Sequence, residues 1–329
     1  MKLPNKNPGP AKGWPILGAM FLFTFGLTAG ENAPFSPGRL SFSVKFKQEI
    51  SNYHTLAISA LPHEKLPFVV VDPSDESDYE IAAEGGTLTA QAPRHWQWEA
   101  PEKPGLYPLR LTRGKSRETM TLNLFVIVPL SKVKDGLLNG YRIGTYPAIP
   151  LRDLAIYKPP RGFVEVTPEL EEVWVSPHFQ LKPFICKQVD SGYPKYIIIR
   201  ERLLLKLELI LEQVNAKGIR CDTFALLSGF RTPYYNKLIG NVKYSRHTWG
   251  GAADIFVDVN PRDGMMDDLN KDGKINVEDA LFLYEMVDDM YGKPWYDSFK
   301  GGLGNYSKTE SHGPFIHIDV RGFRARWGH

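Results

Sequence analysis

Three side chains that can bind one metal ion place the strongest constraint on how this chain folds. His247 and Asp254 lie close together in the segment Ser-Arg-His-Thr-Trp-Gly-Gly-Ala-Ala-Asp, and His317 follows much later in Phe-Ile-His-Ile-Asp. Two imidazoles and one carboxylate are a typical zinc set, which leaves a fourth position for the water that a hydrolase needs. The small residues after His247 permit a tight turn into a strand over residues 253–257. The fold must therefore bring all three side chains to one point.

The spacing of the first segment resembles that of a known enzyme family. Ser-x-His-x-x-Gly-x-Ala-x-Asp is matched at every defined position, and the segment resembles the zinc D-Ala-D-Ala carboxypeptidases and their lysostaphin-like murein endopeptidase relatives. A lone histidine in an apolar strand is more often a core residue, so the assignment depends on the whole motif. The resemblance covers residues 176–329 and implies an α+β zinc peptidase domain. It implies zinc bound by His247, Asp254 and His317.

The resemblance extends upstream to Ser228-Gly-Phe-Arg231, which looks like the family's Ser-Gly-Tyr-Arg-Ser segment. Arg231 is then the predicted substrate clamp, because a guanidinium can bind a peptide carboxylate or carbonyl through two hydrogen bonds. Ser228 is predicted to contact substrate beside it. A structural salt bridge is the alternative role for Arg231.

The catalytic base departs from the family pattern. Many members carry a Glu or His two or three residues before the last ligand, where this chain has Pro314 and Phe315. A hydrolase needs a base to take the proton from the attacking water and deliver it to the leaving amine. Asp319 is favoured for this role, and orienting His317 is the alternative. The other candidates are His312 and Glu310.

A second metal-binding motif is predicted in residues 268–279. The segment fits the calcium loop of EF-hands, with Gly273 at the sharp turn and Asp where the last ligand is usually Glu. This variant resembles dockerin loops, but a single clean copy argues against attachment to a scaffold. A structural Ca²⁺ is predicted, with a solvated acidic turn as the alternative. The predicted ligands are Asp268, Asn270, Asp272, Lys274 through its carbonyl, Asn276 and Asp279.

The first half of the chain has the pattern of short strands. Apolar residues alternate from Leu40 to Phe46, and further short runs follow between Pro, Gly, Asp and Ser turns. This pattern predicts an all-β sandwich over residues 36–130, with a loose resemblance to immunoglobulin-like bacterial modules. Residues 131–175 lack a sustained period and predict an extended connector. Helices are expected at 200–217, where Gly218 supplies the stop, and at about 277–290.

The N-terminus predicts export. An uncharged apolar run follows three lysines within residues 1–30, which is typical of a secretory signal, with an uncleaved membrane anchor as the alternative. These lysines account for the formal net charge of +3, so the rest of the chain is neutral and gives no reason to expect a nucleic-acid partner. Periplasm or cell envelope is the expected location. There, Cys186 and Cys221 could form a disulfide.

Two functions therefore fit the sequence. The favoured one is zinc-dependent hydrolysis of D,D peptide bonds in peptidoglycan stem peptides, as a carboxypeptidase or an endopeptidase. The alternative is a non-catalytic peptidoglycan-binding protein that keeps the zinc fold without a base. Retention of all three ligands favours the enzyme, because an open zinc site is seldom kept for structure alone. The sequence does not indicate the oligomeric state, the ligand of the sandwich or which stem bond is cut.

Overall fold

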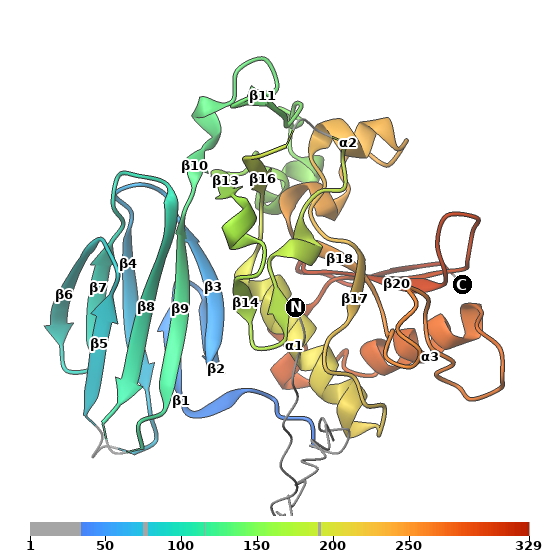
Figure 1. Cartoon of the computed structure of the whole chain (residues 1–329), viewed down its shortest axis with the longest axis horizontal. Coiled ribbons are helices and arrows are strands. Elements are labelled where there is room, and N and C mark those ends of the chain that lie inside the picture. The colour runs from blue at the N-terminus through green and yellow to red at the C-terminus, as the bar shows by residue number, and fades with distance from the viewer. Residues whose placement is uncertain (1–33, 75–77, 115, 190–191, 329) are drawn as a thin grey trace, which may run out of the picture. The chain divides into compact units, whose positions relative to one another are not determined.

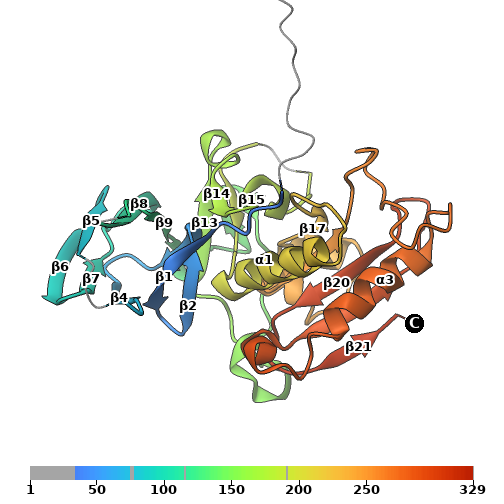
Figure 2. The same ribbon diagram turned by 90° about the horizontal axis from the view of Figure 1, so that it is seen from below.

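Residues 39–126 form two β-sheets, as the alternating apolar pattern predicts. The computed structural model, drawn in Figures 1 and 2, describes residues 34–74, 78–114, 116–189 and 192–328, so the predicted export segment lies outside the described residues. One sheet has the order β2 (Glu49–Tyr53), β1 (Arg39–Phe46), β4 (Lys65–Val71), β7 (His95–Glu99) and β6 (Thr87–Ala92). The other has the order β3 (Thr55–Ala60), β9 (Thr119–Val126), β8 (Gly105–Arg113) and β5 (Tyr79–Ala83).

The two sheets bury apolar side chains in a common core. Alternate residues of β1, among them Phe42 and Val44, are fully buried, as is Trp98 of β7. Phe42 of the first sheet meets Tyr79 of the second edge-on, with 5.1 Å between ring centroids. The described chain is β-rich with few helices, which confirms the coarse prediction for this half. The immunoglobulin-like topology stays a prediction.

The segment predicted as a connector contributes to the second half of the fold. Its strand β13 (Gly162–Val166) pairs with β10 (Val128–Pro129) on one side and β16 (Lys195–Ile197) on the other. Short hairpins flank this sheet, formed by β11 (Leu137–Leu138) with β12 (Tyr141–Arg142) and by β14 (Trp174–Ser176) with β15 (Phe179–Gln180). Tyr146 and Tyr157 pack edge-on against Trp249, which belongs to the metal-binding segment. The segment therefore supports that turn.

A five-stranded sheet carries the predicted metal-binding segments. Its order is β17 (Ala225–Ser228), β18 (Ala252–Phe256), β20 (Phe315–Asp319), β19 (Gly302–Tyr306) and β21 (Ala325–Trp327). Helix α3 (Val277–Asp288) packs on β19 and β20 and contacts α1 (Glu201–Ala216), and Figure 2 shows these helices close together. The helices α1 and α3 confirm the two helices predicted from the sequence. Gly218 follows α1 in a left-handed conformation, as expected of a residue that ends a helix. Helix α2 (Pro233–Leu238) is short.

Cys186 and Cys221 are both buried and both free, so the disulfide considered from the sequence is not formed. Among the described residues, no helix is long and apolar enough to cross a membrane.

A partly buried ion pair joins the first sheet to α1. Lys47 Nζ lies 2.5 Å from Glu201 Oε1, which also accepts a hydrogen bond from the Ser59 backbone N–H at 3.1 Å. Burial raises the pKa of Glu201, but the charge and hydrogen bond of Lys47 lower it by more, so the pKa lies below its ordinary value. A lowered pKa in the folded state means that the pair stabilises the fold at neutral pH, and that this contribution is lost as the pH falls below the ordinary pKa of a glutamate.

We predict that Glu201→Ala lowers the free energy of unfolding at pH 7 by about 2 kcal/mol, because charge-assisted hydrogen bonds contribute on that scale. Urea unfolding would measure the change. Glu80→Ala is the matched control, because the Glu80–Arg117 pair is 72% and 67% exposed and such pairs contribute little. Equal effects of the two substitutions would contradict the prediction.

Candidate metal centre

The metal-binding turn is shaped by glycine. Residues Arg246–Trp249 form one short 3-10 turn, which ends at Gly250 with φ of +63°. A Cβ atom at Gly250 would lie 2.2 Å from the carbonyl oxygen of Ile198, so both the backbone angle and the close approach require glycine. The chain then enters β18, which carries Asp254. This geometry turns His247 back toward the strand.

The three predicted ligands converge. Asp254 and His317 are directly opposite each other in the antiparallel pair β18–β20. Asp254 Oδ1 lies 3.2 Å from His247 Nε2 and 2.8 Å from His317 Nδ1, and the two nitrogens are 3.1 Å apart. Ligand atoms around a tetrahedral zinc lie about 3.3 Å apart. All three side chains are buried, and they are the one group of this kind among the described residues. The cluster can hold a metal ion.

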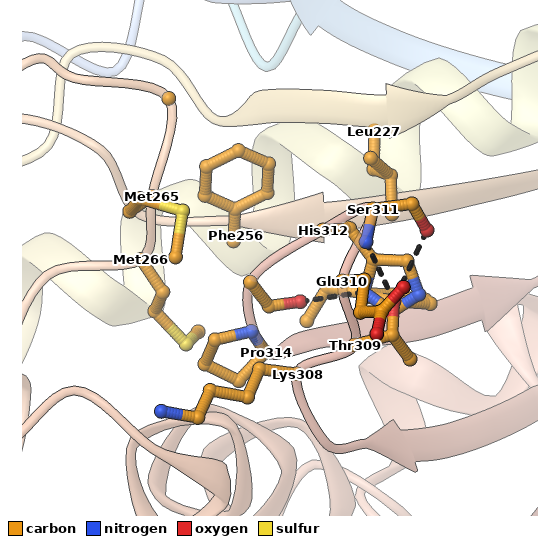
Figure 3. Close-up of a pocket in the computed structure, with 13 residues that line it drawn as sticks. Leu227, Phe256, Met265, Met266, Lys308, Thr309, Glu310, Ser311, His312 and Pro314 are labelled. Carbon is orange, nitrogen blue, oxygen red and sulfur yellow. Dashed lines mark hydrogen bonds between the residues drawn. The ribbon is translucent and has the colours of Figure 1, made fainter.

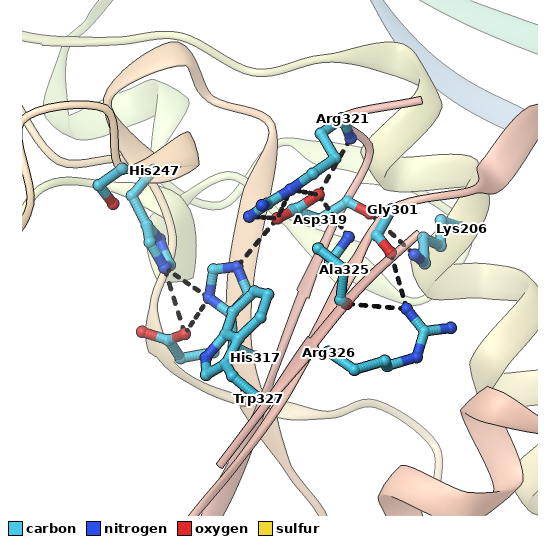
Figure 4. A network of polar contacts seen from close by, with 12 residues as sticks. Lys206, His247, Gly301, His317, Asp319, Arg321, Ala325, Arg326 and Trp327 are labelled. Atoms are coloured by element: carbon cyan, nitrogen blue, oxygen red, sulfur yellow. Dashed lines mark hydrogen bonds and ion pairs between the residues drawn. The ribbon is translucent and has the colours of Figure 1, made fainter. Parts of the chain in front are cut away.

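Hydrogen bonds fix both imidazoles in the form that a metal requires. His247 Nδ1 lies 2.6 Å from the carbonyl oxygen of Gly229, so Nδ1 carries the hydrogen and Nε2 keeps its lone pair. His317 Nε2 lies 3.3 Å from Asp319 Oδ2, which leaves the lone pair on Nδ1. Figure 4 shows the second arrangement, with Asp319 beside His317. The nitrogens that face Asp254 are therefore the free ones, and the donor set fits a divalent cation.

Asp319 lies behind His317, away from the metal position. Its side chain is completely buried and takes hydrogen bonds from the Gly302 backbone N–H at 2.8 Å and from Arg321 Nη2 at 2.5 Å. Burial alone would raise the pKa of Asp319, but His317 and Arg321 hold it well below its usual range. Lys206 on α1 donates to the backbone carbonyl of Asp319 at 2.8 Å. These contacts disfavour Asp319 as the base and support the orienting alternative.

Arg231 is already engaged in the metal centre. Its Nη2 donates to Asp254 Oδ2 at 2.5 Å, and its Nε donates to Ser228 Oγ at 2.7 Å. Burial would raise the pKa of Asp254, yet the histidines hold it below its usual range, so the carboxylate stays charged. Arg231 thus orients the Asp254 ligand through the structural salt bridge that was its alternative role, with a partner that the sequence did not identify. Its role as a substrate clamp stays a prediction, as does the substrate contact of Ser228.

A cavity of about 630 Å³ opens in front of the three ligands, and we call it the metal cavity. Its described lining contains no carboxylate or histidine apart from the ligands themselves. The remaining lining residues are Leu151, Tyr157, Arg231, Asn241, Val242, Lys243, Tyr244, Ser245, Arg246, Tyr306, Phe315, Arg321 and Trp327. The cavity is therefore aromatic and cationic, with no free base among these residues.

The other two base candidates line a separate cavity of about 280 Å³, shown in Figure 3. Glu310 and His312 belong to the loop between β19 and β20 and lie there with Met265 and Met266. Phe315 lines both cavities. Neither candidate therefore lines the metal cavity.

The predicted calcium loop is closed by its own hydrogen bonds. Asp268 accepts from the backbone N–H groups of Asp272 and Gly273, at 3.1 and 2.8 Å. Asp279 is buried and accepts from Leu269 N–H at 2.8 Å and Asn276 N–H at 2.9 Å. Within the described residues, the acidic side chains of the loop do not gather into a metal-binding group. The structure shows no calcium site here.

The preceding segment repeats this hydrogen-bond arrangement. Asp258 accepts from Asp263 N–H at 3.0 Å and Gly264 N–H at 3.1 Å, and Asp267 accepts from Val259 N–H at 3.0 Å. The sequence pattern predicts only one copy, because the first segment has an extra residue before its glycine and Asp267 falls too early for the standard spacing.

We predict that Asp319→Asn lowers zinc affinity by about 10–100-fold, the usual effect of removing a group that orients a metal-binding histidine. Competition with a chelator would measure the change. Glu310→Gln, in the separate cavity, should leave the affinity unchanged. Unchanged zinc affinity in Asp319→Asn together with a hundredfold loss of turnover would restore Asp319 as the base.

Comparisons of the chain with models of known protein families, with curated proteins and with solved structures find no match. The motif resemblance therefore has no independent support from overall similarity. The geometry of the metal centre carries the functional argument.

Proposed function

We propose that this protein is a zinc-dependent hydrolase of D,D peptide bonds in peptidoglycan stem peptides, acting as a D-Ala-D-Ala carboxypeptidase or a murein endopeptidase. One observation carries the proposal: two imidazoles with fixed tautomers and one charged carboxylate meet at the wall of a 630 Å³ cavity. A structural zinc site is closed by four protein ligands, whereas a catalytic one keeps a position open. Three ligands beside a cavity fit the catalytic kind.

Zinc held by His247, Asp254 and His317 would polarise the scissile carbonyl and lower the pKa of a bound water. The chain's own residues prepare this site. Arg231 and Asp319 fix the orientation of Asp254 and His317 through the contacts described above. Arg231 and Lys243 bring positive charge to the cavity lining, which suits a peptide that ends in a carboxylate.

The competing proposal is a peptidoglycan-binding protein without catalysis. It is favoured by one specific observation, the lack of a free carboxylate or histidine in the described lining of the metal cavity. On either proposal the C-terminal half has a zinc peptidase fold, the sheets of residues 39–126 are an immunoglobulin-like module, and the protein acts in the periplasm or cell envelope.

We predict that the zinc-loaded protein removes a terminal D-Ala from purified muropeptides or converts cross-linked dimers to monomers, as measured by mass spectrometry. His247→Ala should lose both the metal and the activity, because it removes a ligand. His95→Ala, an exposed histidine on β7, is the control and should keep both. A zinc-loaded wild-type protein that changes no D,D-linked muropeptide would leave the binding proposal.

We also propose that residues 268–279 bind a structural Ca²⁺ through rearrangement of the loop carboxylates. The support is the complete ligand pattern, with Gly273 at φ of +82° where the loop turns sharply. Calcium at about 10 mM should then raise the melting temperature by about 2–4 °C, because an ion that binds only the folded state stabilises it.

The calcium prediction is tested by thermal unfolding with zinc held constant. Asp268→Ala should abolish the calcium-dependent shift, while Asp297→Ala, an exposed aspartate outside both loops, should retain it. Equal melting temperatures of the wild type in calcium and in a calcium-selective chelator would identify a plain acidic turn.

A further inference from the structure

Tyr306 is held rigidly at the edge of the metal cavity. It is the last residue of β19 and lies opposite Phe315 of β20. The two rings stack with centroids 4.7 Å apart and an interplanar angle of 7°. The side chain remains 37% exposed and lines the cavity together with all three metal ligands. Its hydroxyl therefore stands at a fixed place in the wall.

A neighbouring indole determines what the Tyr306 hydroxyl can do. Trp327 Nε1 donates to the Tyr306 oxygen at 2.7 Å. An indole N–H is a donor only, so the phenol oxygen is the acceptor and its own hydrogen is directed elsewhere. The Trp327 ring also lies against His317, with 5.2 Å between centroids, and Figure 4 shows the two together. The tyrosine oxygen is thus bonded to a residue that contacts a metal ligand.

The position of Trp327 depends on glycine in the neighbouring strand. Gly304 of β19 lies directly opposite His317, and a Cβ atom there would come within 2.3 Å of Trp327 Nε1. This gap lets the indole reach across the strand and hold the hydroxyl of Tyr306. A side chain at residue 304 would displace the indole.

Three other hydrogen-bond donors of the cavity, Tyr244, Arg321 and Arg231, are already used within the protein. The Tyr244 hydroxyl donates to the carbonyl oxygen of Ile149 at 2.9 Å. Arg321 is paired with Asp319, and Arg231 holds Asp254 and Ser228. The Tyr306 hydroxyl differs from these groups, because its oxygen accepts the hydrogen bond from Trp327 and its own hydrogen is left for a ligand.

We propose that Tyr306 is a catalytic residue that donates a hydrogen bond to the scissile carbonyl oxygen as this atom gains negative charge. When a hydroxide, left after a water has released its proton to solvent, adds through its oxygen to the carbonyl carbon, the π electron pair moves to the carbonyl oxygen, and Tyr306 stabilises that charge while it keeps its own proton. The inference rests on the proposed hydrolase function. Apart from the three ligands, the described lining of the metal cavity has no carboxylate or histidine that could act as this donor.

The test compares Tyr306→Phe with Tyr107→Phe, since each substitution removes one tyrosine hydroxyl and Tyr107 lies on β8, outside the metal cavity. Tyr306→Phe should lower kcat by about 100–1000-fold with little change in KM, because an oxyanion donor acts in the transition state. Zinc content should stay at the wild-type value, and the melting temperature should fall by no more than about 4 °C, since the phenyl ring preserves the stack on Phe315 and the hydrogen bond lost from Trp327 is exposed to water. Tyr107→Phe should keep wild-type activity.

The affinity for ligands that are not cleaved can be measured independently of turnover. Calorimetry would compare a phosphinate analogue of the stem peptide, whose tetrahedral oxygens imitate the charged carbonyl oxygen, with the product peptide. Tyr306→Phe should weaken phosphinate binding by at least tenfold and leave product binding unchanged. Equal phosphinate affinities in the two variants, or equal losses for phosphinate and product, would overturn the role of Tyr306 alone. A zinc-loaded wild type that neither cleaves muropeptides nor binds the phosphinate would overturn the proposed function as well.

Discussion

The metal centre depends on the register of one strand pair. In the β18–β20 ladder, Asp254 and His317 occupy directly opposed positions, and their ligand atoms are 2.8 Å apart. Successive side chains of a strand point to opposite faces, so a slip of one residue in either strand would send one ligand to the other side of the sheet. The fixed turn at Gly250 then has only to return His247 to the same face. The site is built on strands, with a single ligand from a turn.

The same register explains the network behind the site. Asp319 follows His317 by two residues and so shares its face of β20, where it accepts from His317 and Arg321. Lys206 of α1 reaches the backbone of the same residue. A buried carboxylate is stable only when its hydrogen bonds are satisfied, and here β19, β20 and the chain after β20 provide them. These contacts hold Asp319 in place, and Asp319 in turn orients the His317 imidazole so that Nδ1 faces the metal position.

Sequence patterns predicted the elements that rest on local periodicity. Helix α1 follows from its apolar spacing and from Gly218, and the ligand set follows from residue chemistry and a long motif. The role of Asp319 could not be read in this way, because proximity in sequence to His317 does not tell on which side of the imidazole a carboxylate lies. Arg231 has the same difficulty: its chemistry suits a substrate carboxylate and equally suits Asp254, and only the fold shows which carboxylate is nearby. The packing of the supposed connector on Trp249 depends on contacts between distant residues that have no local signal.

The two functional proposals differ in one physical requirement. A binding protein needs a metal and a cavity that accepts the ligand, and both conditions fit the three ligands and the aromatic, cationic lining. A peptidase must also move a proton from water to the leaving amine. Asp254 cannot serve freely, because Oδ1 faces the metal position and Oδ2 is held by Arg231. Glu310 and His312 line the next cavity, and Phe315 borders both. A hydrogen-bond donor such as Tyr306 lowers the cost of charge on the carbonyl oxygen but takes up no proton. An enzyme therefore needs a base that the described lining of the metal cavity does not provide, and a binding protein does not.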